Sequence, residues 1–442
     1  MATTLSSDRI QPPESWDELS DAEAFELRAR RVSVPRTGAT DSFRLHAPLE
    51  LLARQALLQH VDPALRPAVR DRMGTTADTF ELSGEPMRSP VAVAHQPADQ
   101  HQRLDLDLDL DLHLHLHLGL GLGLGLRLRL GRAIAAGDVE GADLWMAAVA
   151  PALSVDDLVG AMADEVLLRL AGAAHGSILL HLLLRVAPRS AAATQLGRGL
   201  VAELAADPDP RIEWIDRRPE VSPRRPTSGD RLWAALACPE SLGEPGSIAP
   251  TMSLVDRSGL AAGVLSDSTS GLSVRDARRT LLRTAAHSML QDDPSRAPYG
   301  WTHCLTMPQA TLGIARFCTR PDHAVAVAST YVLGFRSTLS NTPIDPKWQP
   351  ARPRRGRVVD PAELLERGPQ AAAAAMWHAE SEQRPALIRH LAGVAASHHD
   401  AHLAKYTLAC LDAARDDPDG ARLYLAASAH LAAWWADRDA AS

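Results

Sequence analysis

The chain has 442 residues, of which 45% are hydrophobic and 23% charged, so it can bury a sizeable core and is not a disordered protein. Its formal net charge of −8 argues against nucleic acid or an anionic membrane surface as a partner. The polar, acidic amino-terminus, the lack of any run of about 18 apolar residues and the scattered cysteines predict a cytoplasmic protein without a signal peptide, membrane-spanning helix or disulfide framework.

The first third of the chain mixes one clear helix with segments of low order. Residues 1–40 are polar and rich in Pro and Ser, typical of a loosely ordered arm with one short helix. From Ser42, apolar residues three and four apart predict a buried helix, and residues 74–103 read as a Pro/Gly-rich loop. In residues 104–131, Leu alternates with Asp, His, Gly and then Arg. The blocks of identical dipeptides indicate a low-complexity insertion, on the surface or disordered, because its glycines weaken a strand.

The remaining chain shows helical periodicity, and Pro-rich linkers at 207–227 and 341–357 separate its helical blocks. Clear period-two strands are nearly absent outside the repeat. The sequence therefore predicts a mostly α protein, a large multi-helix bundle whose helical domain covers 41–442 around the insertion and the linkers. The expected helices are 132–150, 154–186 with a break near Gly172, 190–206, 228–237, 273–291, 301–318, 323–338, 360–378, 382–414 and 418–436.

Lysine is rare, and one lysine lies in a histidine-rich segment. Of the 46 basic residues only Lys347 and Lys405 are lysine. An arginine serves equally well as a surface cation, so a retained lysine favours amine chemistry that arginine cannot perform, although Lys347 persists in a loop for no visible reason. If HHDAHLAKYTL is helical, His398, His402 and Lys405 share one face. Imidazoles one turn apart chelate a metal well.

Several further histidines lie within apolar helices, where an imidazole needs a polar partner. If histidines from separate helices converge on one cation, all of them are satisfied together. The alternative is that each one hydrogen-bonds a backbone carbonyl or a helix end, and for any single histidine this alternative is favoured. The candidates are His46, His175, His181, His287 and His303.

The order of four short motifs resembles the questin oxidase-like family, helical enzymes of aromatic polyketide metabolism. The matching segments, scattered from about residue 42 to 412, are LHAPLELLA with His46, AAHGSILLHL with His175, THCLTMPQA with His303, and DAHLAKYTLACL with Asp400, His402 and Lys405. The last motif is the most specific. Neither the repeat nor the amino-terminal arm has a counterpart in the family.

The resemblance implies a non-haem iron-dependent oxygenase that uses O2 to cleave a ring of an anthraquinone-like or other polycyclic aromatic polyketide. If the family's ligand positions are transferred to the matching motifs of this sequence, Fe(2+) would be held by His46, His175, His303, His402 and Lys405. Lys405 would then be carbamylated. A buried lysine loses its proton more easily, and the free amine can take up CO2 to form an anionic ligand. Further ligand candidates are His181, His287 and His398.

The substrate pocket and the electron source are less well defined. Tyr299, Trp301 and Met307 flank His303 and could line an apolar pocket, although aromatic residues beside a helix start are more often core. NADPH could still deliver electrons from outside, but no binding loop for it is visible in the sequence.

Three alternatives stay open. The histidines and aspartate of HHDAH also suit a metal-dependent hydrolase that activates water. A non-catalytic helical scaffold would instead place the histidines apart from one another. Lys405 could be a snorkelling lysine or the partner of Asp400 or Asp412 in an ion pair.

Overall fold

The computed structural model describes residues 19–38, 43–87, 122–186, 192–217, 227–243, 246–340, 342–352 and 360–441. Over these ranges the chain is helical without strands, and β-pairing is limited to isolated bridges at Arg36–Pro86 and Arg169–Arg211. The predicted mostly α, multi-helix architecture is confirmed. The α-helices are α1 Asp21–Val32, α2 Phe43–Leu57, α3 Arg66–Glu81, α6 Leu122–Ala135, α7 Val139–Val149, α8 Val155–Leu167, α9 Gly176–Val186, α10 Gly197–Ala206, α11 Gly229–Ala237, α12 Ile248–Arg257, α13 Leu260–Ser268, α14 Val274–Gln291, α15 Thr302–Ile314, α16 Pro321–Leu339, α17 Pro369–His378, α18 Arg384–Ser397, α19 Ala401–Asp416 and α20 Ala421–Asp439.

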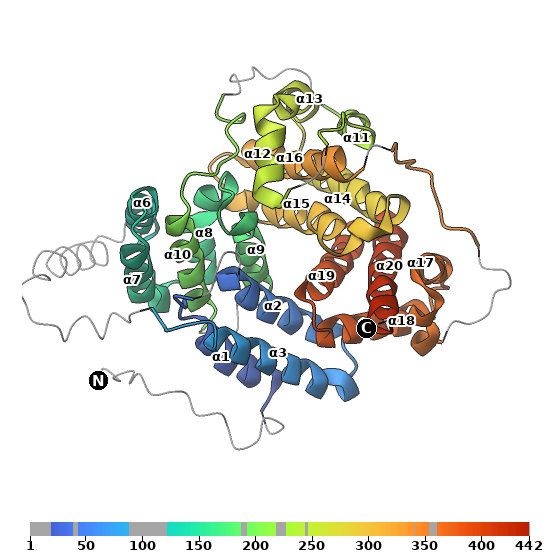
Figure 1. Cartoon of the computed structure of the whole chain (residues 1–442), viewed down its shortest axis with the longest axis horizontal. Coiled ribbons are helices and arrows are strands. Elements are labelled where there is room, and N and C mark those ends of the chain that lie inside the picture. The colour runs from blue at the N-terminus through green and yellow to red at the C-terminus, as the bar shows by residue number, and fades with distance from the viewer. Residues whose placement is uncertain are drawn as a thin grey trace, which may run out of the picture.

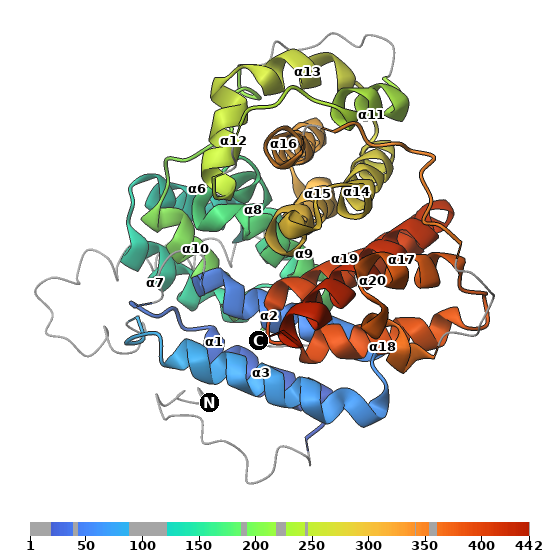
Figure 2. The ribbon, with the colours of Figure 1, turned by 45° about the vertical axis from the view of Figure 1, so that its right-hand side comes forward.

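Consecutive helices form four groups around a shared centre (Figure 1 and Figure 2). Helices α1 to α3 lie along one side, α6 to α10 and α11 to α16 form two further groups, and α17 to α20 close the fourth side. The groups meet where α2 packs against α9 and α19, and where α15 packs against the same two helices. Four helices from distant parts of the chain are thereby brought into contact.

The innermost helices are buried around almost their whole circumference and carry few charged side chains there. In α15 every residue except Gly313 is buried, and in α20 burial is continuous from Leu423 to Trp435. A helix of this kind must sit inside the protein, because it has no polar face to offer to water. The surface helices carry amphipathic patterns and capping residues instead, such as the reciprocal capping box of Ser154 and Asp157 at the start of α8.

Two segments expected to lie outside the core contribute to it. The short helix predicted within the 1–40 arm is present as α1, but the prediction of a loosely ordered arm is wrong for it, because α1 buries Phe25 and packs against α3. Residues 1–18 lie outside the described residues. The prediction of a surface insertion over 104–131 is wrong at its end, because α6 starts at Leu122 and Leu130 is fully buried. Leu130 and Ile134 are four residues apart on one helical face, a row that the dipeptide alternation conceals. Residues 104–121 lie outside the described residues.

The two predicted linkers also pack against the core in part. In the described part of 207–227, Ile212, Trp214 and Ile215 are buried, and Ile344 is buried in 341–357.

Three helices were not predicted. Helix α3 takes the place of part of the loop predicted over 74–103, and α12 and α13 lie where no helix was expected. The sequence of α3, RPAVRDRMGTTADTFE, is polar with a glycine in its middle, so its helical periodicity is weak and tertiary packing decides its conformation.

The predicted single helix over 382–414 is interrupted. Helix α18 ends at Ser397 and α19 begins at Ala401, with Asp400 as the N-cap residue whose carboxylate accepts the backbone N–H of His402 at 2.6 Å. His398 has extended backbone angles at the end of α18. The predicted stripe of His398, His402 and Lys405 on one helix face is therefore wrong for His398.

Candidate metal centre

Four imidazoles form a closed ring at the junction of the helix groups. His46 comes from α2, His175 directly precedes α9, and His303 and His402 lie in the first turns of α15 and α19. Around the ring, centroids are separated by 4.6 Å from His46 to His175, 5.2 Å from His175 to His303, 4.9 Å from His303 to His402, and 5.4 Å from His402 to His46. The four histidines predicted as ligands are thus brought together.

Hydrogen bonds fix the orientation of three of these rings. The Nδ1 atom of His175 bonds the carbonyl oxygen of Gly172 at 2.9 Å, that of His303 bonds the carbonyl oxygen of Tyr299, and that of His402 bonds Asp400 Oδ1 at 3.0 Å. Carbonyl and carboxylate oxygens only accept, so Nδ1 carries the proton in each neutral ring and Nε2 keeps a free lone pair. This is the outer-shell arrangement that orients histidines bound to metals.

The Nε2 atoms of His175 and His303 face each other at 3.3 Å. With both Nδ1 atoms protonated, the two Nε2 lone pairs repel unless a proton or a cation lies between them. Two nitrogens that bind one metal ion at about 2.1 Å each are separated by roughly 3.0–3.4 Å. The ligand atoms of His46, His175 and His402 also lie within 4.8 Å of one another. This group of three does not include His303, so the spacing expected of metal-bound nitrogens is seen between His175 and His303. A set of neutral imidazole nitrogens suits a transition-metal ion such as iron or zinc.

The Gly172 carbonyl that accepts the hydrogen bond from His175 lies in a turn with left-handed backbone angles. Gly172, Ala173 and Ala174 all have left-handed backbone angles, with φ of 54°, 54° and 59°. This conformation costs about 1–2 kcal/mol for a residue with a Cβ. A Cβ on Gly172 would come within 2.7 Å of Leu45 Cδ1. The break predicted near Gly172 thus exists, and its turn presents the Gly172 carbonyl to the His175 ring.

Burial keeps all four imidazoles neutral. It lowers the pKa of His402 to about 4, with a further contribution from the Lys405 charge. The pKa values of His46, His175 and His303 are lowered well below the usual value, again chiefly by burial. Neutral imidazoles are the form that binds metals.

Lys405 lies one turn after His402 on α19 and is only 5% exposed. Within the described chain its Nζ has no hydrogen-bond partner. Burial lowers its pKa to about 8, although the charges of Asp400 and Glu50 oppose this shift. The alternative of an ion pair with Asp400 or Asp412 is not seen among the described residues: Asp412 pairs with Arg185 at 2.8 Å, and Asp400 pairs with His402 at 3.0 Å.

A hydrogen-bonded chain runs from the centre toward the surface. Asp400 accepts from His402 and from the Tyr299 hydroxyl at 3.1 Å. Burial alone would raise the pKa of Asp400, but these hydrogen bonds outweigh it and lower the pKa, so the carboxylate stays ionised. His398 accepts the Asp400 backbone N–H at Nδ1 and donates from Nε2 to Asp439 at 3.1 Å. Both His398 nitrogens are occupied, so His398 supports Asp400 and is not a fifth ligand.

The sequence analysis missed Glu50, a buried carboxylate one turn after His46 on α2. Its Oε1 accepts from Arg54 at 2.7 Å, Arg72 at 3.1 Å and Thr76 at 2.7 Å. Arg54 and Arg72 also donate to the backbone carbonyls of His398 and His399, in the segment between α18 and α19, and so help to hold this break. A Glu four residues after a predicted ligand is the signal that could have identified it.

Two predicted ligand candidates lie away from the centre. His181 packs against Gly313, and burial lowers its pKa to about 3. His287 accepts at Nδ1 from Gln291 at 2.9 Å, and its ring contacts Trp233 edge-on. Neither belongs to the ring of four imidazoles.

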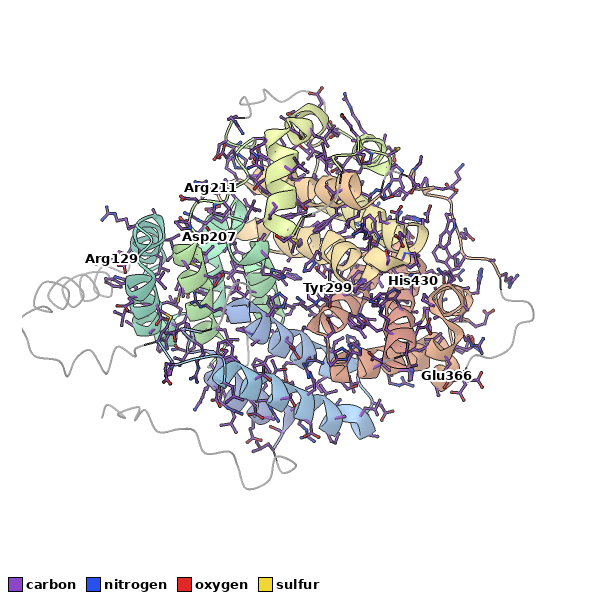
Figure 3. All side chains as sticks on the ribbon, viewed as in Figure 1. Arg129, Asp207, Arg211, Tyr299, Glu366 and His430 are labelled. Atoms are coloured by element: carbon purple, nitrogen blue, oxygen red, sulfur yellow. The ribbon has the colours of Figure 1, made fainter. Side chains whose placement is uncertain are left out.

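Of the predicted pocket residues, only Tyr299 is seen to contact the centre. It precedes α15 in a π-helical turn, Ala297–Trp301, and its ring meets His402 edge-on at 4.9 Å. Figure 3 labels it near the middle of the molecule. Trp301 is fully buried, with the Arg336 guanidinium 5.8 Å from its ring, and Met307 is buried in α15.

Comparison of the chain with family models, with curated protein sequences and with solved structures finds no match. The resemblance to questin oxidase-like proteins therefore depends on the four short motifs alone. Among the described helices, none is both long enough and apolar enough to cross a membrane.

Proposed function

We propose that the protein is a non-haem iron-dependent oxygenase that cleaves a ring of an anthraquinone-like or other polycyclic aromatic polyketide. The observation that carries the proposal is the ring of four imidazoles, in which the Nε2 atoms of His175 and His303 face each other at 3.3 Å. The motif resemblance, which contains the same four histidines, supplies the reaction class and the substrate class.

His46, His175, His303 and His402 would hold Fe(2+), and Lys405 would join them as a carbamate. An ammonium at Lys405 repels a divalent cation, whereas a carbamate converts the same side chain into an anionic oxygen ligand. A buried amine with no hydrogen-bond partner is suited to this modification because its uncharged form is favoured. When bound, ferrous iron supplies the electrons and the coordination position that O2 activation requires.

Aromatic rings at the outer edge of the centre suit a planar substrate. Tyr299 is 52% exposed, and its ring lies 6.4 Å from that of Trp435. Offset or edge-on contact with such rings favours a polycyclic aromatic molecule. The Tyr299 hydroxyl donates to Asp400, so the proton on Tyr299 is held at the edge of the centre, next to a carboxylate that also orients His402.

The other interpretations receive less support. A hydrolase needs a carboxylate free to activate water, and both oxygens of Asp400 already accept hydrogen bonds. A scaffold protein would place the histidines apart, which is the opposite of the observed arrangement. All four cysteines are free thiols, which suits a reducing cytoplasm as the place of action.

Oxygen consumption tests the proposal. Protein loaded with Fe(2+) under anaerobic conditions should consume O2 with a polyhydroxylated anthraquinone, and 18O from O2 should appear in a ring-opened product, with and without added NADPH. His303→Ala should abolish the uptake, whereas His181→Ala, at a histidine outside the ring, should preserve it. Hydrolysis of p-nitrophenyl phosphate without oxygen uptake would favour the hydrolase instead.

A further inference from the structure

A second site lies at the far ends of the helices that carry the metal centre. His303 and His402 lie at the starts of α15 and α19, whereas Gly313 near the end of α15 and Asp416 at the end of α19 line a pocket of about 670 Å³. At 1.5 Å per residue, ten or more helical residues separate the two places by roughly 15 Å. The pocket is therefore distinct from the imidazole ring.

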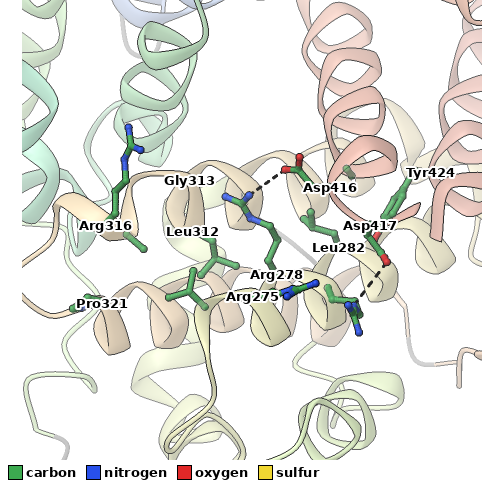
Figure 4. Close-up of a pocket in the computed structure, with 14 residues that line it drawn as sticks. Arg275, Arg278, Leu282, Leu312, Gly313, Arg316, Pro321, Asp416, Asp417 and Tyr424 are labelled. Atoms are coloured by element: carbon green, nitrogen blue, oxygen red, sulfur yellow. Dashed lines mark hydrogen bonds and ion pairs between the residues drawn. The ribbon is translucent and has the colours of Figure 1, made fainter. Parts of the chain in front are cut away.

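Guanidinium groups dominate the pocket (Figure 4). Four arginines and two aspartates line it, three of the arginines from α14 and one from the 3-10 turn Ala315–Phe317 that follows α15. The arginines are Arg275, Arg278, Arg279 and Arg316, and the aspartates are Asp416 and Asp417. The lining carries more positive than negative charge, in a protein whose overall charge is −8.

The aspartates do not use up the arginine donors. Asp417 is already held by two N–H groups of Arg283 at 2.7 Å and by the Tyr424 hydroxyl at 3.0 Å. Arg279 lies 3.8 Å from Asp417, too far for a hydrogen bond. Arg278 makes one contact with Asp416 at 3.2 Å, and Arg275 has no ion pair with any described residue. A guanidinium has five donors, so most of those on these three arginines are available.

The positions of the three α14 arginines are electrostatically unfavourable within the helix itself. Arg275 is in the first turn of α14, at the positive end of the helix dipole. Arg278 and Arg279 follow it at i+3 and i+4, so like charges share one helix face. Both unfavourable effects are relieved when an anion binds between these side chains.

The rest of the lining is apolar. Leu282, Leu312 and Ala315 contribute to it, and so does Tyr424. The volume lies within the range of small-molecule sites, about 300–1,000 Å³. We propose that this pocket binds a small organic anion, with a carboxylate or phosphate group held by Arg275, Arg278 and Arg279 and an apolar body against Leu282 and Leu312.

Isothermal titration calorimetry with four probes tests this site. The probes are 2-naphthoate, 2-naphthyl phosphate, inorganic phosphate and the uncharged 2-naphthamide. One or both naphthyl anions should bind with sub-millimolar Kd, and which one binds separates carboxylate from phosphate recognition. Inorganic phosphate should bind more weakly because it lacks the apolar body, and the amide should not bind. Raising the NaCl concentration should weaken the binding of the anions.

Variants assign the binding to the pocket. Arg275→Gln should weaken the naphthyl anion about tenfold or more, because a charge-assisted contact is lost. Arg279→Gln should act in the same direction, and both side chains are exposed, so folding should be unaffected. Arg257→Gln, an exposed arginine on α12, should leave the Kd unchanged. Equal binding of the amide, no binding of either naphthyl anion, or unchanged affinity in both pocket variants would overturn the proposal without bearing on the metal centre.

Discussion

Lys405 determines the charge balance of the candidate centre. An ammonium at Lys405 would oppose the proposed metal, whereas a carbamate would serve as one of its ligands. Lys405→Arg should therefore prevent metal binding while leaving the helical fold intact. Arginine keeps the positive charge and cannot react with CO2. Metal content of the purified variant, compared with helicity by circular dichroism, measures the effect.

The chain offers a matched control for Lys405, since its other lysine, Lys347, is exposed in a loop. Lys347→Arg should retain metal like the wild type. With 13C-bicarbonate, the wild-type protein and Lys347→Arg should each show one carbamate signal by NMR that Lys405→Arg lacks. If Lys405→Arg keeps a full complement of metal, the lysine is not a ligand.

The neutral imidazoles make the metal-free protein sensitive to acid. In the unfolded chain a histidine has a pKa near 6.5, whereas in the folded protein His402 has a pKa of about 4 and those of His46, His175 and His303 are also lowered. The unfolded state therefore binds more protons between these values. Stability that is present above pH 6.5 should be lost as the pH falls toward 4, by about 1.4 kcal/mol per pH unit for each such histidine.

Denaturant titrations of the metal-free protein from pH 7 to pH 5 check this expectation. In His303→Gln, the slope of the unfolding free energy against pH should correspond to the uptake of about one proton fewer on unfolding than in the wild type. An unchanged slope in His303→Gln would show that this imidazole is not held neutral by the fold.

At the scale of elements, the break between α18 and α19 determines which histidines can meet. Asp400 both caps α19 and orients His402, so it connects helix formation to the geometry of the centre. The arginines that hold the break, Arg54 and Arg72, come from α2 and α3, more than 300 residues earlier in the chain. The centre therefore depends on contacts between the first and the last helix groups.

Removing the Asp400 carboxylate should have two separable effects. Asp400→Ala should cost about 1 kcal/mol of stability from the lost cap, and should weaken metal binding about 10–100-fold because His402 loses its orienting partner. Asp138→Ala, which removes the N-cap of α7, should cost similar stability with no effect on metal. Asp400→Asn, which keeps an acceptor oxygen, should recover most of the stability. Wild-type metal affinity in Asp400→Ala would contradict the orienting role.

At the scale of the whole molecule, local patterns predicted the helical class and a wider set of candidate histidines, because a histidine within an apolar helix must find a polar partner. The choice of His46, His175, His303 and His402 came from the motif resemblance, and local patterns alone did not separate them from His181 and His287. They could not predict that His398 lies outside the helix face shared by His402 and Lys405. This depends on Arg54 and Arg72, which are more than 300 residues away in the sequence and bind the backbone carbonyls of His398 and His399. The left-handed turn at Gly172 likewise depends on tertiary packing against Leu45. The start of α6 was not predicted, because every second residue of the repeat is leucine. The helical spacing of Leu130 and Ile134 does not stand out from this alternation.

The central claim is that imidazoles from four distant segments of the chain share one cation, and metal stoichiometry by mass spectrometry tests it most directly. Wild-type protein, as purified or after anaerobic loading with Fe(2+) and desalting, should hold about one equivalent of metal per chain, within the nitrogen-rich geometry expected of such a site. His175→Ala should hold almost none, and His181→Ala should match the wild type. A wild-type protein that retains no metal after loading, or equal metal in His175→Ala, would contradict the account.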